Sequence, residues 1–207
     1  MYQSFLTKSN WIHLIKRLIL LLKQTRHLRY FNIQIMIIAL TGFMGVGKST
    51  IAERLSLFLY CKYTDLDKII EHKCSQTIET LFATKGEAEF RKIEEDALEN
   101  FISGNKDQTH ILSLGGGALV SEKNRKLIKE NTFCIYLKAN EITLQNRISK
   151  SHKSRPLMKN LTSVQMTEKI SDMLSVRETG YLDVSKAVVD VDNLTISEVV
   201  GKIISLI

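Results

Sequence analysis

Short apolar runs recur along the chain, and longer segments with helical spacing separate them. Four runs are largely apolar: MIIAL (36–40), ILSL (111–114), FCIYL (133–137) and AVVDV (187–191). Runs that are apolar on both faces are typical of buried strands in a parallel sheet. A shorter segment, KYTD (62–65), fits a fifth strand.

The segments between the runs have the spacing of amphipathic helices. One apolar stripe follows the first run, at Ile51, Leu55, Phe58 and Leu59. Another lies in a long acidic segment, at Phe90, Ile93, Ala97 and Phe101. This alternation of strands and helices predicts an α/β fold, a three-layer sandwich in which helices cover both faces of a five-stranded parallel sheet.

One segment interrupts the alternation. SKSHKSRPLMKN (149–160) is polar and basic, and it contains Pro156, the single proline of the chain. We interpret it as a mobile lid. Arg155 lies in it, where a cation could close over a phosphoryl group during its transfer.

The chain has 207 residues and a net charge of +7, but the charge is unevenly distributed. Residues 1–35 hold six Lys or Arg and no Asp or Glu, so residues 36–207 carry only +1. A nearly neutral domain argues against nucleic-acid binding by the folded part. The three cysteines are widely spaced without a Cys-x-x-Cys pair, which argues against a disulfide framework or a zinc site.

The segment GFMGVGKST (42–50) contains the motif G-x-x-x-x-G-K-[ST], at Gly42, Gly47, Lys48 and Ser49. It lies between an apolar strand and a helical pattern, as a phosphate-binding P-loop requires. Backbone N–H groups of such a loop converge on phosphate oxygens, the lysine neutralises them, and the serine hydroxyl ligates Mg²⁺. The alternative is a chance glycine-rich turn. The context favours a P-loop fold that binds a nucleotide.

Asp65 and Asp67 end the KYTD strand. Their spacing places both carboxylates on one side of an extended segment, or one on the strand and one on the next helix. Carboxyl ends of parallel strands line the ligand crevice, where one carboxylate can support Mg²⁺ through water and the other can accept a proton. The alternative is that Asp67 only caps the following helix.

A triple glycine follows the next strand, in LGGGAL (114–119). Consecutive glycines are costly unless the backbone approaches a ligand closely or adopts positive φ, so we favour a binding surface over a plain loop. Arg91 and Arg177 are each, taken alone, ordinary solvated or paired arginines.

Six segments together resemble shikimate kinases in order and spacing. They are GFMGVGKST, DLD, GEAEFRKIEE, LGGGAL, SRPL and RETGY, and the resemblance covers residues 36 to about 192. It implies transfer of the ATP γ-phosphoryl group to the 3-hydroxyl of shikimate, a step towards aromatic amino acids.

The resemblance also implies a role for individual residues. The nucleotide would contact the P-loop, a lid arginine and an arginine that stacks on adenine: Gly45, Val46, Gly47, Lys48, Ser49, Thr50, Arg155 and Arg147. Mg²⁺ would be held by Ser49 and, through water, by Asp65. Shikimate would contact Asp67, Arg91, Gly116, Gly117 and Arg177, and the catalytic groups would be Asp67, Lys48 and Arg155.

Two segments depart from the family pattern. The loop after the last strand, VDVDNLTIS, lacks the proline that many members place against adenine, which leaves the adenine contacts there open. ETGYLDVS follows Arg177 in place of a proline-containing run, although Tyr181 keeps its position.

Residues 1–35 form a basic, amphipathic extension of the predicted domain, 36–207. Its apolar residues fall on one helical face: Trp11, Leu14, Ile15, Leu18, Ile19 and Leu22. Three interpretations remain open, namely translation from an upstream start codon with Met36 as the true start, organelle targeting, or contact with an anionic membrane. The longest apolar run in it, Leu18 to Leu22, is too short to span a bilayer.

The alternatives to a shikimate kinase are another small P-loop kinase, such as one acting on gluconate or a nucleoside monophosphate, and a non-catalytic nucleotide-binding protein. The paired arginines and the triple glycine favour an anionic polyol as substrate. We expect a cytoplasmic monomer with ATP, Mg²⁺ and a small-molecule substrate, without a nucleic-acid partner or stable membrane insertion.

Overall fold

The computed structural model describes residues 35–151, 158 and 161–207. The predicted N-terminal extension therefore lies outside the described residues except for Ile35. Arg155 and most of the predicted lid also lie outside them. Within the described part of the chain, no helix is both long enough and apolar enough to cross a membrane.

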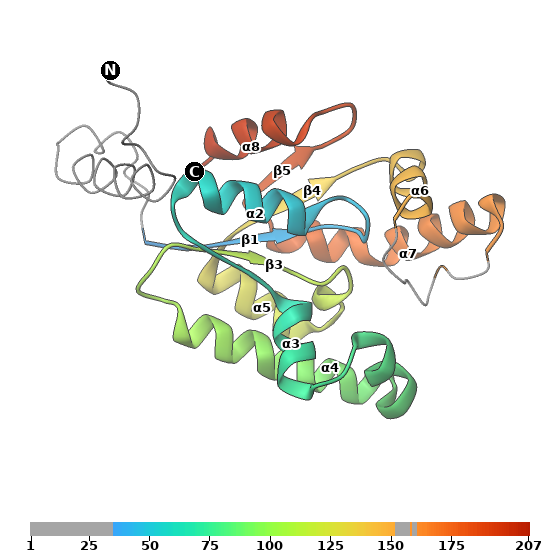
Figure 1. Cartoon of the computed structure of the whole chain (residues 1–207), viewed down its shortest axis with the longest axis horizontal. Coiled ribbons are helices and arrows are strands. Elements are labelled where there is room, and N and C mark those ends of the chain that lie inside the picture. The colour runs from blue at the N-terminus through green and yellow to red at the C-terminus, as the bar shows by residue number, and fades with distance from the viewer. Residues whose placement is uncertain (1–34, 152–157, 159–160) are drawn as a thin grey trace, which may run out of the picture. The chain divides into compact units, whose positions relative to one another are not determined.

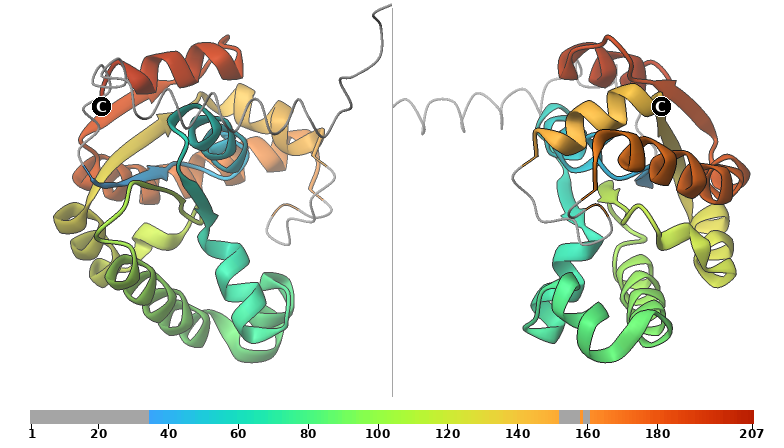
Figure 2. Two further views of the ribbon diagram at one scale, coloured as in Figure 1. Left: turned by 60° about the vertical axis from the view of Figure 1, so that its left-hand side comes forward. Right: turned by 90° about the vertical axis from the view of Figure 1, so that its right-hand side faces the viewer.

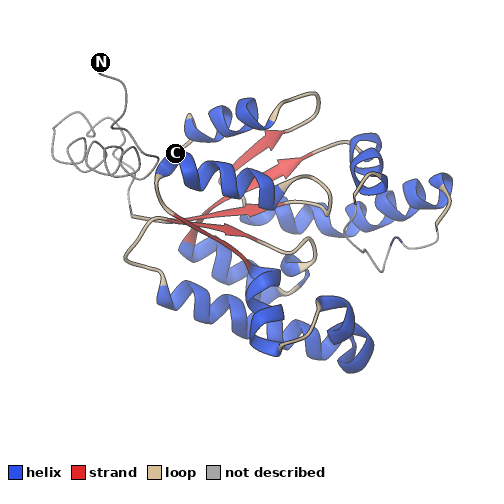
Figure 3. Ribbon diagram, in the orientation of Figure 1, coloured by secondary structure: helices blue, strands red, loops and turns tan. Residues whose placement is uncertain are grey.

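Five parallel strands form one sheet in the order β2-β3-β1-β4-β5 (Figures 1 and 3). The strands are β1 (Ile37–Thr41), β2 (Lys62–Asp65), β3 (His110–Ser113), β4 (Thr132–Lys138) and β5 (Ala187–Asp190). Each strand begins and ends within one residue of its predicted run. The predicted P-loop α/β fold is thus confirmed.

The strand order determines where a ligand can bind. β1 is central, with β3 on one side and β4 on the other. The chain passes from β3 to β4 across β1, so connections leave the carboxyl end of the sheet in opposite directions. Crevices form at such a switch point. The loops after β1 and β3 flank it.

Helices cover both faces of the sheet (Figures 1 and 3). One face packs against α2 (Lys48–Leu59) and α8 (Ile196–Ile204), and α6 (Glu141–Ser149) extends this core. The other packs against α3 (Leu66–Cys74), α4 (Ile78–Gly104), α5 (Glu122–Asn131) and the end of α7 (Ser163–Val184). β1 shows why both faces must be covered: Ile38 and Leu40 belong to the first core, and Ile37 and Ala39 to the second.

The two predicted helical stripes are largely buried. Ile51 and Leu55 of α2 contribute to the first core, whereas Phe58, in the last turn of this helix, is 50% exposed. In α4, Phe90 and Ala97 are buried.

α3 and the first part of α4 lie side by side at one end of the domain (Figure 2). α4 is kinked at Gly86, whose φ of 77° and ψ of 171° are not helical. Glycine permits this positive φ without a Cβ clash. Arg91 follows the kink by little more than one turn.

Candidate active site

The P-loop connects β1 to α2 and depends on close backbone approach. A Cβ on Gly42 would lie 2.4 Å from the Leu137 carbonyl oxygen of β4, and Gly42 has a φ of +138°. Gly47 caps α2 in the left-handed conformation, and no side chain caps this helix within the described part of the chain. The first N–H groups of α2 are therefore directed at any anion in the loop.

The predicted nucleotide residues occupy this loop and the first turn of α2. Val46 is buried in the first core, whereas Thr50 is exposed. Gly45 has a positive φ of 85°. Lys48 is buried, and its Nζ donates hydrogen bonds to the carbonyl oxygens of Gly42 (2.7 Å) and Phe43 (3.0 Å). Lys48 thus forms hydrogen bonds with the backbone of the same loop in which it is expected to bind phosphate.

Ser49 and Asp65 meet beside the P-loop. The Ser49 hydroxyl donates a 2.6 Å hydrogen bond to Asp65 Oδ2. Asp65 Oδ1 accepts the backbone N–H of Asp67 and so caps α3. A hydroxyl and a carboxylate are the oxygen donors that Mg²⁺ prefers. No group of three or more His, Cys, Asp or Glu side chains with metal-binding geometry occurs among the described residues, so an ion here would also need water or phosphate ligands.

The alternative in which Asp67 only caps the next helix is wrong. Asp65 is the cap residue, and α3 begins at Leu66, so Asp67 lies inside the first turn. Of the two predicted arrangements, the structure therefore has the one with Asp65 at the end of the strand and Asp67 on the helix. Asp65 caps the helix because its extended backbone (φ −104°, ψ 123°) directs Oδ1 at the N–H of residue 67.

The triple glycine is the surface that the functional side chains approach. A Cβ on Gly115 would lie 2.8 Å from Asp67 Oδ1, and one on Gly117 would lie 2.8 Å from Arg91 Nη2. A Cβ on Gly116 would lie 3.1 Å from the backbone nitrogen of Met44 in the P-loop. A side chain at these positions would crowd Asp67, Arg91 or the P-loop backbone, which favours a surface of close approach over a plain loop.

Arg91 is held by charged and aromatic neighbours on the same helix. Its Nη1 donates to Glu94 (2.7 Å) and its Nη2 to Glu87 (3.0 Å). The guanidinium carbon lies 5.4 Å from the ring centre of Phe90 and 5.9 Å from that of Phe82, within the range of cation–π attraction. Burial lowers the pKa of Arg91, but the two glutamates outweigh this and raise it.

Glu94 is a site residue that the sequence analysis missed. It is 1% exposed, and a Cβ on Gly115 would lie 3.3 Å from its Oε1. Burial raises the pKa of Glu94; Arg91 opposes this, while the Asp67 and Glu95 carboxylates add to it. A signal was present, because Glu94 is a charged residue within the apolar stripe of α4, three residues after Arg91.

Arg177 also contacts the triple glycine. It lies on α7, and its Nη1 donates to the Gly116 carbonyl oxygen (3.3 Å). Tyr181, one turn later, donates its hydroxyl to the same oxygen at 2.5 Å. Burial raises the pKa of Tyr181 to about 12, so the phenol remains a donor at neutral pH. Two arginines from distant helices are thus brought to adjacent glycines.

Arg147 of α6 links the P-loop to the loop after β5. Its Nη1 donates to the Val46 carbonyl oxygen (2.8 Å) and its Nη2 to that of Val191 (3.4 Å). It therefore lies on the opposite side of the P-loop from the arginines at the triple glycine, consistent with a nucleotide-base position. The predicted lid residue Arg155 lies outside the described residues.

The arrangement places the P-loop between Arg147 on one side and the triple glycine, with Arg91 and Arg177, on the other. Asp67 lies beside Gly115, Arg91 lies beside Gly117, and Arg177 contacts the carbonyl oxygen of Gly116. Two guanidinium groups can hold a carboxylate through paired hydrogen bonds, and Asp67 can accept a proton from a nearby hydroxyl. Such a site suits phosphoryl transfer to a hydroxylated carboxylic acid.

Comparisons with known proteins identify the family of this chain. The family model "Shikimate kinase" matches residues 44–207. A shikimate kinase from Dictyoglomus turgidum is 34% identical over 169 residues, which covers 81% of this chain and 94% of that protein.

Two solved structures are similar throughout the domain. The shikimate kinase of Bacteroides thetaiotaomicron has a TM-score of 0.78 at 25% identity, covering 84% of this chain and 98% of that one. The shikimate kinase of Acinetobacter baumannii, solved in complex with shikimate, has a TM-score of 0.76 at 28% identity, covering 84% and 93%.

Proposed function

The chain belongs to the shikimate kinase family, and we propose on this premise that it transfers the γ-phosphoryl group of ATP to the 3-hydroxyl of shikimate, giving shikimate 3-phosphate and ADP. One observation carries the proposal: Arg91 and Arg177 approach adjacent glycines of one loop, beside Asp67 and next to the P-loop. Shikimate has one carboxylate and three hydroxyls, which matches two arginines and one acceptor carboxylate.

The carboxylate of shikimate would bind between Arg91 and Arg177. Arg91 is paired with two glutamates that differ in exposure, since the Glu87 side chain is 66% exposed and that of Glu94 is 2% exposed. The substrate carboxylate would replace Glu87 on Nη2, while Glu94 keeps Nη1 in position. The backbone of Gly116 and Gly117 would form the remaining wall.

Asp67 would accept the proton of the 3-hydroxyl as its oxygen attacks the γ-phosphorus. The bond from the γ-phosphorus to the β,γ-bridging oxygen breaks, and ADP leaves with the bond electrons. ATP binding would draw Lys48 Nζ from the Gly42 and Phe43 carbonyls to the β and γ phosphates. Arg155 would approach the transferring group when the lid closes, which would also keep water away from it.

Ser49 and Asp65 would hold Mg²⁺, the first directly and the second through water. This assignment is supported by their oxygen donors, which lie 2.6 Å apart beside the P-loop. When bound, the ion supplies positive charge that neutralises the β and γ phosphates. The Ser49–Asp65 hydrogen bond would be exchanged for these contacts.

The test is a coupled assay of ADP release by the full chain with ATP, Mg²⁺ and shikimate. Shikimate-dependent release that falls at least about 100-fold in Asp67→Asn is the expected result, because the proton acceptor is lost while the shape is kept. Gluconate is the comparison substrate. A protein that binds ATP but releases ADP only with gluconate, or with neither acid, contradicts the proposal.

We further propose that residues 36–207 form the catalytic domain and act as a monomer in the cytoplasm. The three cysteines, all free, and the use of ATP support this location. Protein that begins at Met36 should keep the turnover of the full chain and elute as one domain in size-exclusion chromatography. Loss of turnover on removing residues 1–35 would contradict the proposed domain boundary.

A further inference from the structure

The part of α7 that carries Arg177 is attached to the rest of the domain on two sides. On one side, Arg177 and Tyr181 both donate to the Gly116 carbonyl oxygen. On the other side, Glu178 faces β4. Successive helical residues point about 100° apart, so neighbouring residues 177 and 178 are directed to different surroundings by the same turn.

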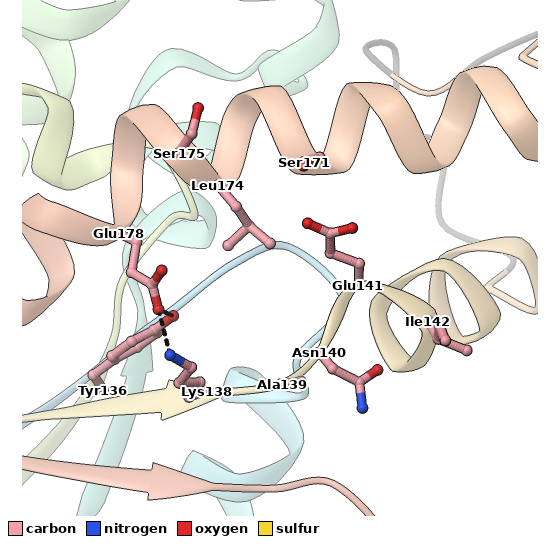
Figure 4. Close-up of a pocket in the computed structure, with 10 residues that line it drawn as sticks. All are labelled: Tyr136, Lys138, Ala139, Asn140, Glu141, Ile142, Ser171, Leu174, Ser175 and Glu178. Atoms are coloured by element: carbon pink, nitrogen blue, oxygen red, sulfur yellow. Dashed lines mark hydrogen bonds and ion pairs between the residues drawn. The ribbon is translucent and has the colours of Figure 1, made fainter.

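Glu178 makes two polar contacts with β4. Its Oε1 accepts from Lys138 Nζ at 2.8 Å and from the Tyr136 hydroxyl at 3.2 Å (Figure 4). The Tyr136 ring also lies 5.2 Å from that of Tyr181. Hydrogen bonding to Lys138 lowers the pKa of Glu178, which therefore stays ionised at neutral pH.

An open cleft of about 530 Å³ lies beyond this contact. Figure 4 shows it between α7 and the start of α6, with Glu178, Tyr136 and Lys138 at one end and Glu141 nearer the other. The Glu178 side chain borders this cleft and is 33% exposed. The polar contacts of Glu178 join this turn to β4, next to the ring contact of Tyr136 with Tyr181.

We propose that Glu178 is a positioning residue for shikimate binding, and that its contacts with Lys138 and Tyr136 fix the rotation of α7 that presents Arg177 to the substrate carboxylate. The inference rests on the proposed function. Without Glu178, the turn keeps the Tyr181 ring against Tyr136 and the contacts of Arg177 and Tyr181 with Gly116, but it loses the polar contacts that oppose rotation about the helix axis. Part of the free energy of shikimate binding is then used to order Arg177, so the affinity for shikimate falls.

The experiment compares Glu178→Ala with wild-type full chain, measuring KM for shikimate, KM for ATP and kcat. We expect KM for shikimate to rise about three- to tenfold, because a small displacement of a binding group is costly. KM for ATP should stay within about twofold and kcat should change little, since Arg177 contributes binding to ground and transition states alike. Glu178→Gln keeps an acceptor oxygen but loses the charge. Its KM for shikimate should lie between those of the wild type and Glu178→Ala.

A matched control removes another ion pair of the same helix. Asp183 of α7 pairs with Lys129 of α5 at 2.6 Å, with similar exposure to the pair under test. Asp183→Ala should leave KM for shikimate unchanged. The charge-exchanged double variant, Lys138→Glu with Glu178→Lys, should recover part of the lost affinity for shikimate.

Three outcomes overturn the inference: an unchanged KM for shikimate in Glu178→Ala, an equal rise in Asp183→Ala, or an equal rise in KM for ATP. If Glu178→Ala does not fold, Glu178→Gln decides the question by the same criteria. Wild-type protein without shikimate-dependent turnover would instead refute the proposed function, so the two failures are distinguishable.

Discussion

Replacing Gly117 with alanine should displace Arg91, one of the two arginines proposed to bind the substrate, without disturbing the fold. Gly117 has a φ of −113° and a ψ of 0°, which alanine adopts without strain. The added Cβ would lie 2.8 Å from Arg91 Nη2 and 3.2 Å from Nη1. The clash is therefore with the guanidinium group alone and not with backbone.

The size of the effect follows from how far Arg91 must move. To reach ordinary contact from 2.8 Å, the guanidinium has to shift by about 0.6 Å. Glu94 and the rings of Phe82 and Phe90 oppose that shift. Misplacement by about 1 Å can cost 100-fold, so we expect kcat/KM for shikimate to fall about 10- to 100-fold, or about 1.4–2.7 kcal/mol.

The assay is coupled ADP release at varied shikimate and saturating ATP, with thermal unfolding measured in parallel. Gly104→Ala is the control, because a Cβ there meets no atom within 4 Å. Most of the loss should appear in KM for shikimate. A Gly117→Ala enzyme with the wild-type KM for shikimate would refute the placement of Arg91 in the substrate pocket, and a lowered melting temperature would show that the loop and not the arginine was disturbed.

Three further predictions concern the metal, the buried glutamate and a buried histidine. Ser49→Ala should raise the Mg²⁺ concentration needed for half-maximal turnover at least about tenfold, since it removes a proposed ligand; an unchanged Mg²⁺ titration would exclude Ser49 as a ligand. The pKa of Glu94 is raised by burial, so KM for shikimate should increase on acidification at a pH above the usual glutamate value, and Glu94→Gln should abolish that pH dependence because Gln cannot titrate. Burial, with the charge of Lys62, lowers the pKa of His110. On acidification, His110 therefore becomes protonated at a higher pH in the unfolded chain than in the folded one, and the free energy of unfolding should decrease as the pH falls below about 6.5. His110→Gln, compared by urea unfolding at pH 7 and pH 5, should show a smaller decrease than wild type.

The sequence alone determined the fold class and the phosphate-binding loop, because both depend on local pattern. Strands buried on both faces are apolar at nearly every position, and the P-loop is one contiguous motif next to β1. Asp65 and Asp67 could be placed near the crevice because strand ends line it. Which of them caps α3 could not be predicted, since that depends on backbone dihedral angles at a single residue.

Only the tertiary structure decided which side chains meet. Arg91 and Arg177 are 86 positions apart in the sequence, and nothing local brings them to adjacent glycines. Glu94 could be seen as a charge in an apolar stripe, but its role depends on Arg91 and Gly115 being folded around it. The contact of Glu178 with β4 requires the crossover of α7 onto the sheet. Local periodicity encodes which face of an element is buried, whereas the identity of its neighbours across that face follows from strand order and helix packing.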